Sequence, residues 1–169
     1  MWHGGPMVHA MREPAHRVSP RARRLWAVEA ALAVLVALAA QAVWWFVDDA
    51  PDRTAHRVVA AVWAVVGLGY LVVMPQWRYR VHRWEATPTA IYTQTGWLNL
   101  ERRIAPLSRV QTVDLERGPL SQLLGLASVT VTTASAAGPV RIHGLDLPVA
   151  LDLVDSLTAA AVLDVGDAT

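Results

Sequence analysis

The sequence contains no cysteine and no lysine, and it shows no motif of a common enzyme class. Without cysteine the chain forms no disulfide bond and no thiolate metal site, which fits a reducing compartment. All 15 basic residues are arginine, and a net charge of +1 carries no nucleic-acid signature. The nucleophile-elbow, zinc-protease and phosphate-loop patterns are also absent. We therefore predict a protein that is not an enzyme, with no catalytic residue, no cofactor, no metal site and no nucleic-acid partner.

Two long apolar runs occupy the N-terminal half of a chain whose residues are 54% hydrophobic. Residues 25–47 would form a helix about 34 Å long and residues 58–74 one about 26 Å long, against a hydrocarbon core of about 30 Å. We predict that these runs are two transmembrane helices joined by an extracytoplasmic loop at residues 48–57. Residues 1–24 contain prolines and no apolar periodicity, and they are predicted to be a disordered tail.

Small residues recur at helical spacing on both apolar runs, where they would let two helix backbones approach closely in lipid. The predicted packing stripes are Ala30, Ala33, Ala37 and Ala40 on the first helix and Ala60, Ala64 and Gly67 on the second. In a chain this rich in alanine, such stripes also arise by chance. Gln41 offers one additional interhelical hydrogen bond.

Arginine is unevenly distributed around the two apolar runs. Five arginines precede the first run and three closely follow the second, whereas the connecting loop has two arginines and three aspartates. The positive-inside rule then places both termini in the cytoplasm. The sequence therefore predicts a multi-pass plasma-membrane protein with a cytoplasmic C-terminal domain.

Beyond the second run, the apolar period changes from helical to strand-like. Residues 77–82 alternate between apolar and polar and are predicted to form the first of six or seven short antiparallel strands. On the third predicted strand, Leu98, Leu100 and Ile104 are expected to share one face. Val110–Glu116 is predicted to be the fourth strand, and a short helical turn follows it.

The last predicted element is an amphipathic helix that caps the strands. Asp146 is predicted to be its N-cap, and Pro148 lies in its first turn. Its predicted apolar face consists of Ala150, Leu151, Val154, Leu157 and Ala161. The fold class is thus a membrane helical hairpin followed by a small, mainly-β barrel at residues 76–163, with a frayed end at residues 164–169.

Several short blocks follow one another in the C-terminal half, namely Tyr79-Arg80-Val81, Gly96-Trp97-Leu98, Pro106–Val113, Gly118-Pro119-Leu120, Leu123–Leu126 and Gly144-Leu145. Over residues 76–157 this succession resembles the YdbS-like bacterial PH (pleckstrin-homology) domain, a membrane-anchored module usually preceded by two transmembrane helices. The resemblance implies a PH-like barrel. Members often occur beside a larger membrane protein with repeated copies of the domain, so the resemblance also implies such a hetero-complex, in cell-envelope stress defence. A homo-oligomer is the other expected assembly.

Charge divides the predicted domain into a basic and an acidic part. Residues 78–145 contain eight arginines and four acids, whereas residues 146–169 contain five aspartates and no base. His82 and His143 lie far apart on predicted strands and are expected at a surface or an interface. The eight arginines are candidate contacts for membrane lipid or a partner protein, namely Arg78, Arg80, Arg83, Arg102, Arg103, Arg109, Arg117 and Arg141.

Three functions remain open at the level of the sequence. The first is a membrane-anchored scaffold that docks a partner at the cytoplasmic face. The second is a module that binds anionic lipid headgroups, which requires a fold that gathers the arginines. The alternative reading of those arginines is that they only hold orientation and solubility. The third function is an accessory subunit of a transport complex, for which only Glu29 and Gln41 argue.

Overall fold

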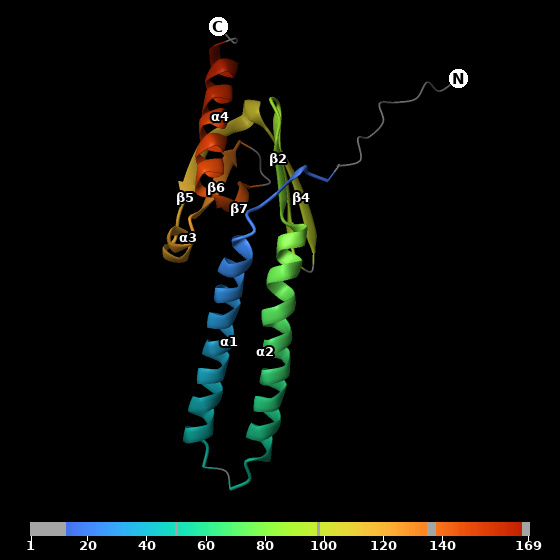
Figure 1. Cartoon of the computed structure of the whole chain (residues 1–169), viewed down its shortest axis with the longest axis vertical. Coiled ribbons are helices and arrows are strands. Elements are labelled where there is room, and N and C mark those ends of the chain that lie inside the picture. Colours follow the sequence, from blue (N-terminus) through green and yellow to red (C-terminus); the bar gives the residue numbers. More distant parts are fainter. Residues whose placement is uncertain (1–12, 50, 98, 135–137, 167–169) are drawn as a thin grey trace, which may run out of the picture.

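A helical hairpin projects from one end of a domain built mainly of β-strands (Figure 1). The computed structural model describes residues 13–49, 51–97, 99–134 and 138–166. The hairpin consists of α1 (Ala22–Val47) and α2 (Thr54–Val81), and both helices are long and apolar enough to cross a membrane. The two predicted spans lie inside these helices.

Helix α2 extends past residue 74, where the predicted span ends, continues through Pro75 and stops only at Val81. The predicted first strand at residues 77–82 is therefore wrong, because nearly all of that segment is helical. Proline is tolerated inside a membrane helix where neighbouring groups shield the backbone it leaves unpaired. Pro75 is fully buried, so protein atoms and not lipid surround it.

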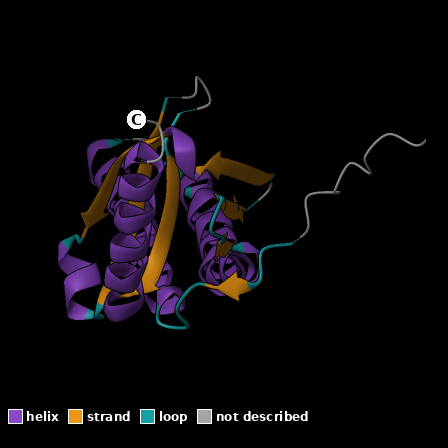
Figure 2. Ribbon diagram, turned by 90° about the horizontal axis from the view of Figure 1, so that it is seen from above, coloured by secondary structure: helices purple, strands orange, loops and turns teal. Residues whose placement is uncertain are grey.

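Two antiparallel sheets make up the domain, with strand orders β1-β2-β3-β4 and β5-β6-β7. The strands are β1 (His16–Arg17), β2 (Arg83–Ala86), β3 (Ala90–Gly96), β4 (Leu100–Pro106), β5 (Val110–Glu116), β6 (Leu126–Thr133) and β7 (Val140–Asp146). Short helical turns follow β4 and β5, and a long helix ends the chain, namely η1 (Leu107–Arg109), α3 (Pro119–Leu123) and α4 (Leu147–Gly166). The predicted order of a hairpin, antiparallel strands and a C-terminal helix is confirmed (Figure 2).

The strands run alternately toward and away from the hairpin (Figure 1). The β3–β4 turn lies at the hairpin end, where the indole Nε1 of Trp77 donates a hydrogen bond to the Trp97 carbonyl at 2.7 Å. The opposite end holds the β2–β3 turn and η1, joined by a bond from the Leu107 amide to the Thr89 carbonyl at 2.9 Å. Residues near Trp97 are thus close to the apolar helices, and residues near Leu107 are far from them.

Leu100 and Ile104 share one face of β4, as predicted, and that face points outward. Ile91 on β3 pairs with Ala105 on β4, and both are buried. Directly opposed residues of an antiparallel pair point to the same side of the sheet, so odd-numbered β4 residues face inward. Leu100 and Ile104 therefore face outward, and their side chains are 53% and 45% exposed. Leu98 lies outside the described residues.

On α4 the buried face consists of Ala150, Leu153 and Leu157, so Leu151 was wrongly assigned to it and is exposed. This face packs on the β5-β6-β7 sheet, whose Val129 and Val131 are fully buried. The side chain of Ala161 is not among those described. The helix continues to Gly166, beyond the predicted frayed start at residue 164.

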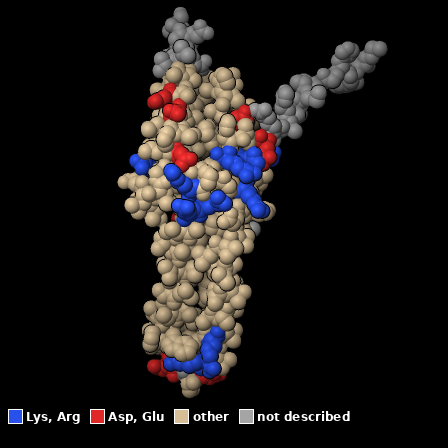
Figure 3. All heavy atoms as spheres, viewed as in Figure 1, with Lys and Arg blue, Asp and Glu red and all other residues tan. Residues whose placement is uncertain are grey.

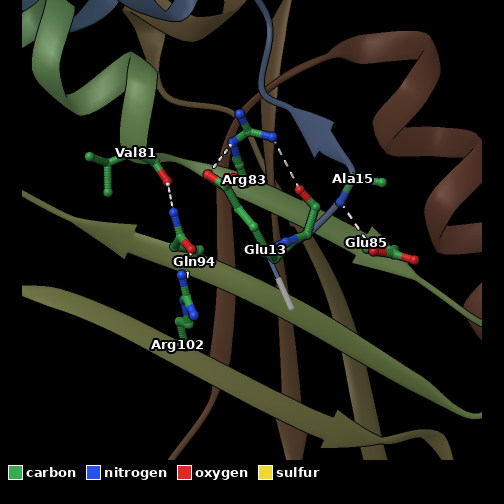
Figure 4. Close-up of polar contacts among 8 residues, drawn as sticks. Glu13, Ala15, Val81, Arg83, Glu85, Gln94 and Arg102 are labelled. Carbon is green, nitrogen blue, oxygen red and sulfur yellow. Dashed lines mark hydrogen bonds and ion pairs between the residues drawn. The ribbon is translucent and has the colours of Figure 1, made fainter. Parts of the chain in front are cut away.

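The segment before α1 belongs to the domain, in contrast to the predicted tail at residues 1–24. Residues 1–12 lie outside the described part, but β1 pairs with β2 and places His16 opposite Trp84. An ion pair of 2.9 Å joins Arg83 to Glu13, and the Ala15 amide donates a hydrogen bond to Glu85 at 3.1 Å (Figure 4). Residues 13–17 are thus held to the domain by the pairing of β1 with β2 and by these polar contacts, although they show no apolar periodicity.

The hairpin is fixed to the domain by the first turns of α1. Ala22 and Trp26 are buried in the domain core. The Ser19 hydroxyl donates a hydrogen bond of 2.7 Å to the carboxylate of Asp146, the predicted N-cap of α4, and Arg21 lies 3.6 Å from the same oxygen. The Ser19 amide also bonds to the Gly144 carbonyl at 2.9 Å. The domain therefore cannot swing freely on its anchor.

Contact between the two long helices uses only part of the predicted small-residue stripes. Ala30 and Gly67 are buried, and a Cβ at Gly67 would be 3.2 Å from Val34 Cγ1. Ala37 and Ala60 are half-buried, whereas Ala33, Ala40 and Ala64 are exposed on the hairpin surface. Within the described residues, Nε2 of Gln41 is buried without a hydrogen-bond partner, so the predicted interhelical bond is not formed.

Candidate functional site at the hairpin–domain junction

A cavity of about 440 Å³ lies where α2 meets the open end of the two sheets. We call it the junction pocket. It is lined by Tyr70, Met74, Arg78, His82, Thr93, Thr95, Gly96, Trp97, Glu101, Arg103, Pro139, Arg141 and His143. Helix α2, the β3–β4 hairpin and β7 each contribute one wall, so the pocket exists only because the hairpin is fixed to the domain.

Three arginines from different elements converge on the junction pocket. Arg78 on α2 is held over the Trp26 ring at 4.7 Å and lies 3.6 Å from Glu29 of α1. Arg103 on β4 pairs with Glu101 at 2.6 Å and donates a hydrogen bond to the Pro139 carbonyl at 3.1 Å. Arg141 on β7 is exposed, and its guanidinium forms no hydrogen bond or ion pair within the described residues.

Two histidines, far apart in the sequence, share the same pocket. Burial and the nearby Arg78 guanidinium lower the pKa of His82 to about 4. Burial, Arg78 and Arg141 also lower the pKa of His143. Both imidazoles are therefore neutral at pH 7. The contribution of the arginines to these shifts indicates a positive potential inside the pocket.

Aromatic side chains form the end of the junction pocket that is nearer to the apolar helices. The rings of Tyr70 and Trp97 lie 6.1 Å apart, and Trp77 is bonded to the Trp97 backbone. These contacts hold the β3–β4 turn against α2. Indole and phenol rings prefer the boundary between hydrocarbon and headgroups, so this edge suits a membrane interface.

The comparisons with known proteins identify the family. A family model described as Bacterial PH domain matches residues 22–161. The chain belongs to this family. It is also 29% identical over 156 residues to the UPF0699 transmembrane protein YdbS of Bacillus subtilis (strain 168), which covers 89% of this chain and 96% of that protein. No solved structure matches. The chain is thus a membrane protein carrying a bacterial PH domain, and the two apolar helices are its transmembrane helices.

The eight arginines that the sequence predicts as contacts lie in several separate groups in the structure. The junction pocket gathers Arg78, Arg103 and Arg141. A second cavity of about 320 Å³ is lined by Arg102 and Arg109 together with Arg103. The eight therefore do not form a single patch.

The remaining three arginines of the predicted set serve elsewhere. Arg80 is exposed on α2. Arg83 pairs with Glu13, and Arg117 donates a hydrogen bond to the Leu126 carbonyl at 3.2 Å. Arg102, which lines the second cavity, also donates a hydrogen bond of 2.8 Å to the side chain of Gln94 on the outer face of the first sheet (Figure 4).

Sequence reasoning did not include Arg21, Arg23 and Arg24 among the candidate contacts. With Gln76 they line a hollow of about 560 Å³ at the start of α1. The signal that could have identified them is their position, because they flank the first apolar run as Arg78, Arg80 and Arg83 flank the second. We call these six residues the arginine girdle. Figure 3 shows arginines gathered at this level, between the uncharged surface of the hairpin and the domain.

At the opposite end of the hairpin, the loop forms a separate polar cluster. His56 is buried, and its Nε2 lies 2.7 Å from the Asp48 carboxylate. Its ring packs against Trp44 and Trp45 at 4.0 and 5.3 Å. This cluster closes the hairpin loop, and the sequence pattern gave no indication of it.

Proposed function

We propose that this protein is a non-enzymatic membrane anchor that holds a bacterial PH domain against the cytoplasmic leaflet, where the arginine girdle binds anionic phospholipid. The observation that carries the proposal is the placement of the girdle at the end of the hairpin that joins the domain (Figure 3). An arginine held near an anionic membrane surface contributes about 1 kcal/mol to binding. Several such residues on one rigid body act together.

The orientation follows from the charges at the two ends of the hairpin. The girdle has six arginines, whereas the loop has Arg53 and Arg57 beside Asp48, Asp49 and Asp52. The positive-inside rule assigns the end richer in arginine to the cytoplasm. We therefore propose a multi-pass plasma-membrane protein with both termini and the PH domain in the cytoplasm.

Cation–π contacts support a fixed geometry of the girdle. Arg23 lies 4.8 Å from the centre of the Tyr79 ring, and Arg78 lies over Trp26. Each contact joins α1 to α2 just below the domain. These two contacts hold Arg23 and Arg78 at the junction between the hairpin and the domain, and a fixed position near the leaflet favours binding over solvation alone.

The absence of cysteine makes the orientation directly testable. Asp49→Cys in the loop and Ser156→Cys on α4 each introduce a single thiol at an exposed position. In intact cells a membrane-impermeant maleimide is expected to label Asp49→Cys at once and Ser156→Cys only after lysis. Labelling of Ser156→Cys in intact cells would overturn the proposed orientation.

Lipid binding by the girdle is tested in vesicles that contain the full chain. Spin-labelled phosphatidylglycerol is expected to associate more strongly than spin-labelled phosphatidylcholine, and the preference is expected to fall with added salt. Arg24→Gln/Arg80→Gln removes two exposed girdle charges and is expected to reduce the preference. The matched control, Arg102→Gln/Arg109→Gln, removes two exposed arginines outside the girdle and is expected to retain it. Equal association of both lipids with the unaltered chain would contradict the proposal.

A second candidate function, docking of a partner with the same domain, is favoured by one feature of β4. This edge strand exposes Leu100 and Ile104 on its outer face. An exposed strand edge with apolar neighbours is suited to adding a strand from another chain. Cross-linking through Ile104→Cys in native membranes is expected to yield a product of defined mass, and Thr158→Cys on α4 serves as the control. Recovery of monomers alone from both variants would exclude this function.

A further inference from the structure

The junction pocket changes from apolar to basic along its length. Tyr70, Met74 and Arg78 are spaced four residues apart, so they follow one face of α2 over about 12 Å. Trp97 faces Tyr70 on the hairpin side. A molecule in the pocket would meet aromatic and apolar groups at that end and guanidiniums at the other, which is the division between the acyl and headgroup parts of a phospholipid.

The basic end has more positive charge than its own carboxylates compensate. Arg78, Arg103 and Arg141 line it together with one acidic residue, Glu101, which already pairs with Arg103. Glu29 approaches Arg78 only to 3.6 Å, from outside the pocket. Since the Arg141 guanidinium has no polar partner in the described part of the chain, it is available for an external anion.

Neutral histidines beside the arginines make the pocket suitable for one negative charge. The arginines help to lower the pKa values of His82 and His143, as described above. An anion placed among Arg78, Arg141 and His143 would offset the positive potential that they experience. It would also raise the pKa of His143, which makes this residue a reporter of occupancy.

We propose that the junction pocket binds the phosphodiester of one anionic membrane phospholipid, whose acyl end lies along Met74 and Tyr70. Guanidinium groups match phosphate oxygens in geometry and charge. A volume of about 440 Å³ is in the range of small-molecule sites. The excess positive charge disfavours a headgroup that carries its own cation. This inference rests on the proposed function for its location, because Tyr70 must lie at the level of the bilayer.

The test is native mass spectrometry of the full chain in detergent with three probes: dioleoyl phosphatidylglycerol, dioleoyl phosphatidylcholine and inorganic phosphate. One phosphatidylglycerol is expected to bind in a saturable manner, and phosphatidylcholine far more weakly. Arg141→Gln is expected to weaken phosphatidylglycerol binding roughly tenfold to a hundredfold, because a hydrogen bond to a charged group is lost. Arg109→Gln, which removes an exposed arginine that does not line the junction pocket, is the matched control and is expected to bind normally.

A second measurement reports occupancy of the pocket without depending on whether Arg141→Gln folds. The ring resonances of ¹³C-labelled histidine, assigned with His143→Gln, are expected to show a higher pKa for His143 when phosphatidylglycerol is present and no change with phosphatidylcholine. Equal binding of the two lipids, or competition by inorganic phosphate at the same concentration, would overturn the proposal. Retention of full affinity by Arg141→Gln would also overturn it. The girdle variant Arg24→Gln/Arg80→Gln is expected to keep the single site, so failure of the girdle proposal and failure of the pocket proposal are distinguishable.

Discussion

Gly144 in β7 and Ala22 in α1 are packed so closely that a Cβ at residue 144 would be 2.6 Å from the Cβ of Ala22. Gly144 also has a φ of +74°, which disfavours any residue with a side chain. We predict that Gly144→Ala lowers the free energy of unfolding by about 2–5 kcal/mol, because strain and overpacking add. Thermal unfolding in detergent measures this.

The matched control is Gly69→Ala, since a Cβ at that position on α2 meets no atom within 4 Å. Its melting temperature is expected to equal or slightly exceed that of the unaltered chain, because alanine favours a helix more than glycine does. A melting temperature of Gly144→Ala as high as that of the control would mean that the junction between hairpin and domain tolerates movement.

The contact between the two transmembrane helices depends on Gly67. A methyl group there would already lie 3.2 Å from Val34 Cγ1, so a larger side chain must separate the helices. We predict that Gly67→Ile destabilises the protein in detergent by about 1–3 kcal/mol. Gly69→Ile places the same side chain on the open face of the same helix and is expected to leave stability nearly unchanged. Comparable melting temperatures for the two variants would refute close packing at Gly67.

Most of the architecture was predictable because its signals are local. The spans at residues 25–47 and 58–74 lie within α1 and α2, and Val110–Glu116 is β5 as predicted. Residues 77–82 were misread because a short alternating segment after a proline matches a strand as well as the end of a helix. In the structure α2 continues through Pro75 to Val81, where Trp77 contacts the β3–β4 turn and Tyr79 contacts Arg23 of α1, and these contacts depend on the tertiary structure.

The candidate site was only partly predictable, for a reason of geometry. Arg78, Arg103 and Arg141 were all among the predicted contacts, but nothing local separates them from Arg80 or Arg109. Their convergence depends on the register of β4 and β7 and on the continuation of α2 past Pro75. The sequence therefore identifies arginine as the type of residue that contacts a ligand, but the pairing of the strands determines which arginines line the pocket.

The segment before α1 is expected to depend on the ion pair between Arg83 and Glu13. The Arg83 side chain is 20% exposed, and the pair measures 2.9 Å. We predict that Arg83→Gln speeds tryptic cleavage after Arg17 several-fold, because β1 then separates more often from β2. Arg80→Gln, an exposed neighbour without this contact, is the control and is expected to leave the cleavage rate unchanged. Equal cleavage rates would show that strand pairing alone holds the segment.

The burial of His82 predicts how stability varies with pH. Its pKa is about 4 in the folded protein, below the ordinary value of 6.5. The unfolded chain therefore binds the proton first, so the contribution of His82 is complete above pH 6.5 and is lost as the pH falls toward 4. The loss is on the order of 3 kcal/mol. The lowered pKa of His143 acts in the same direction.

The measurement compares melting temperatures in detergent at about pH 7.5 and about pH 5 for each variant. His82→Gln is expected to reduce the difference between the two values, because the residue that titrates is gone. Its absolute stability also falls, since the His82 ring packs 4.9 Å from that of Trp26, so only the difference is informative. His16→Gln, at an exposed position, is expected to keep the full difference. If His82→Gln kept it as well, the acid sensitivity would have to arise from other groups.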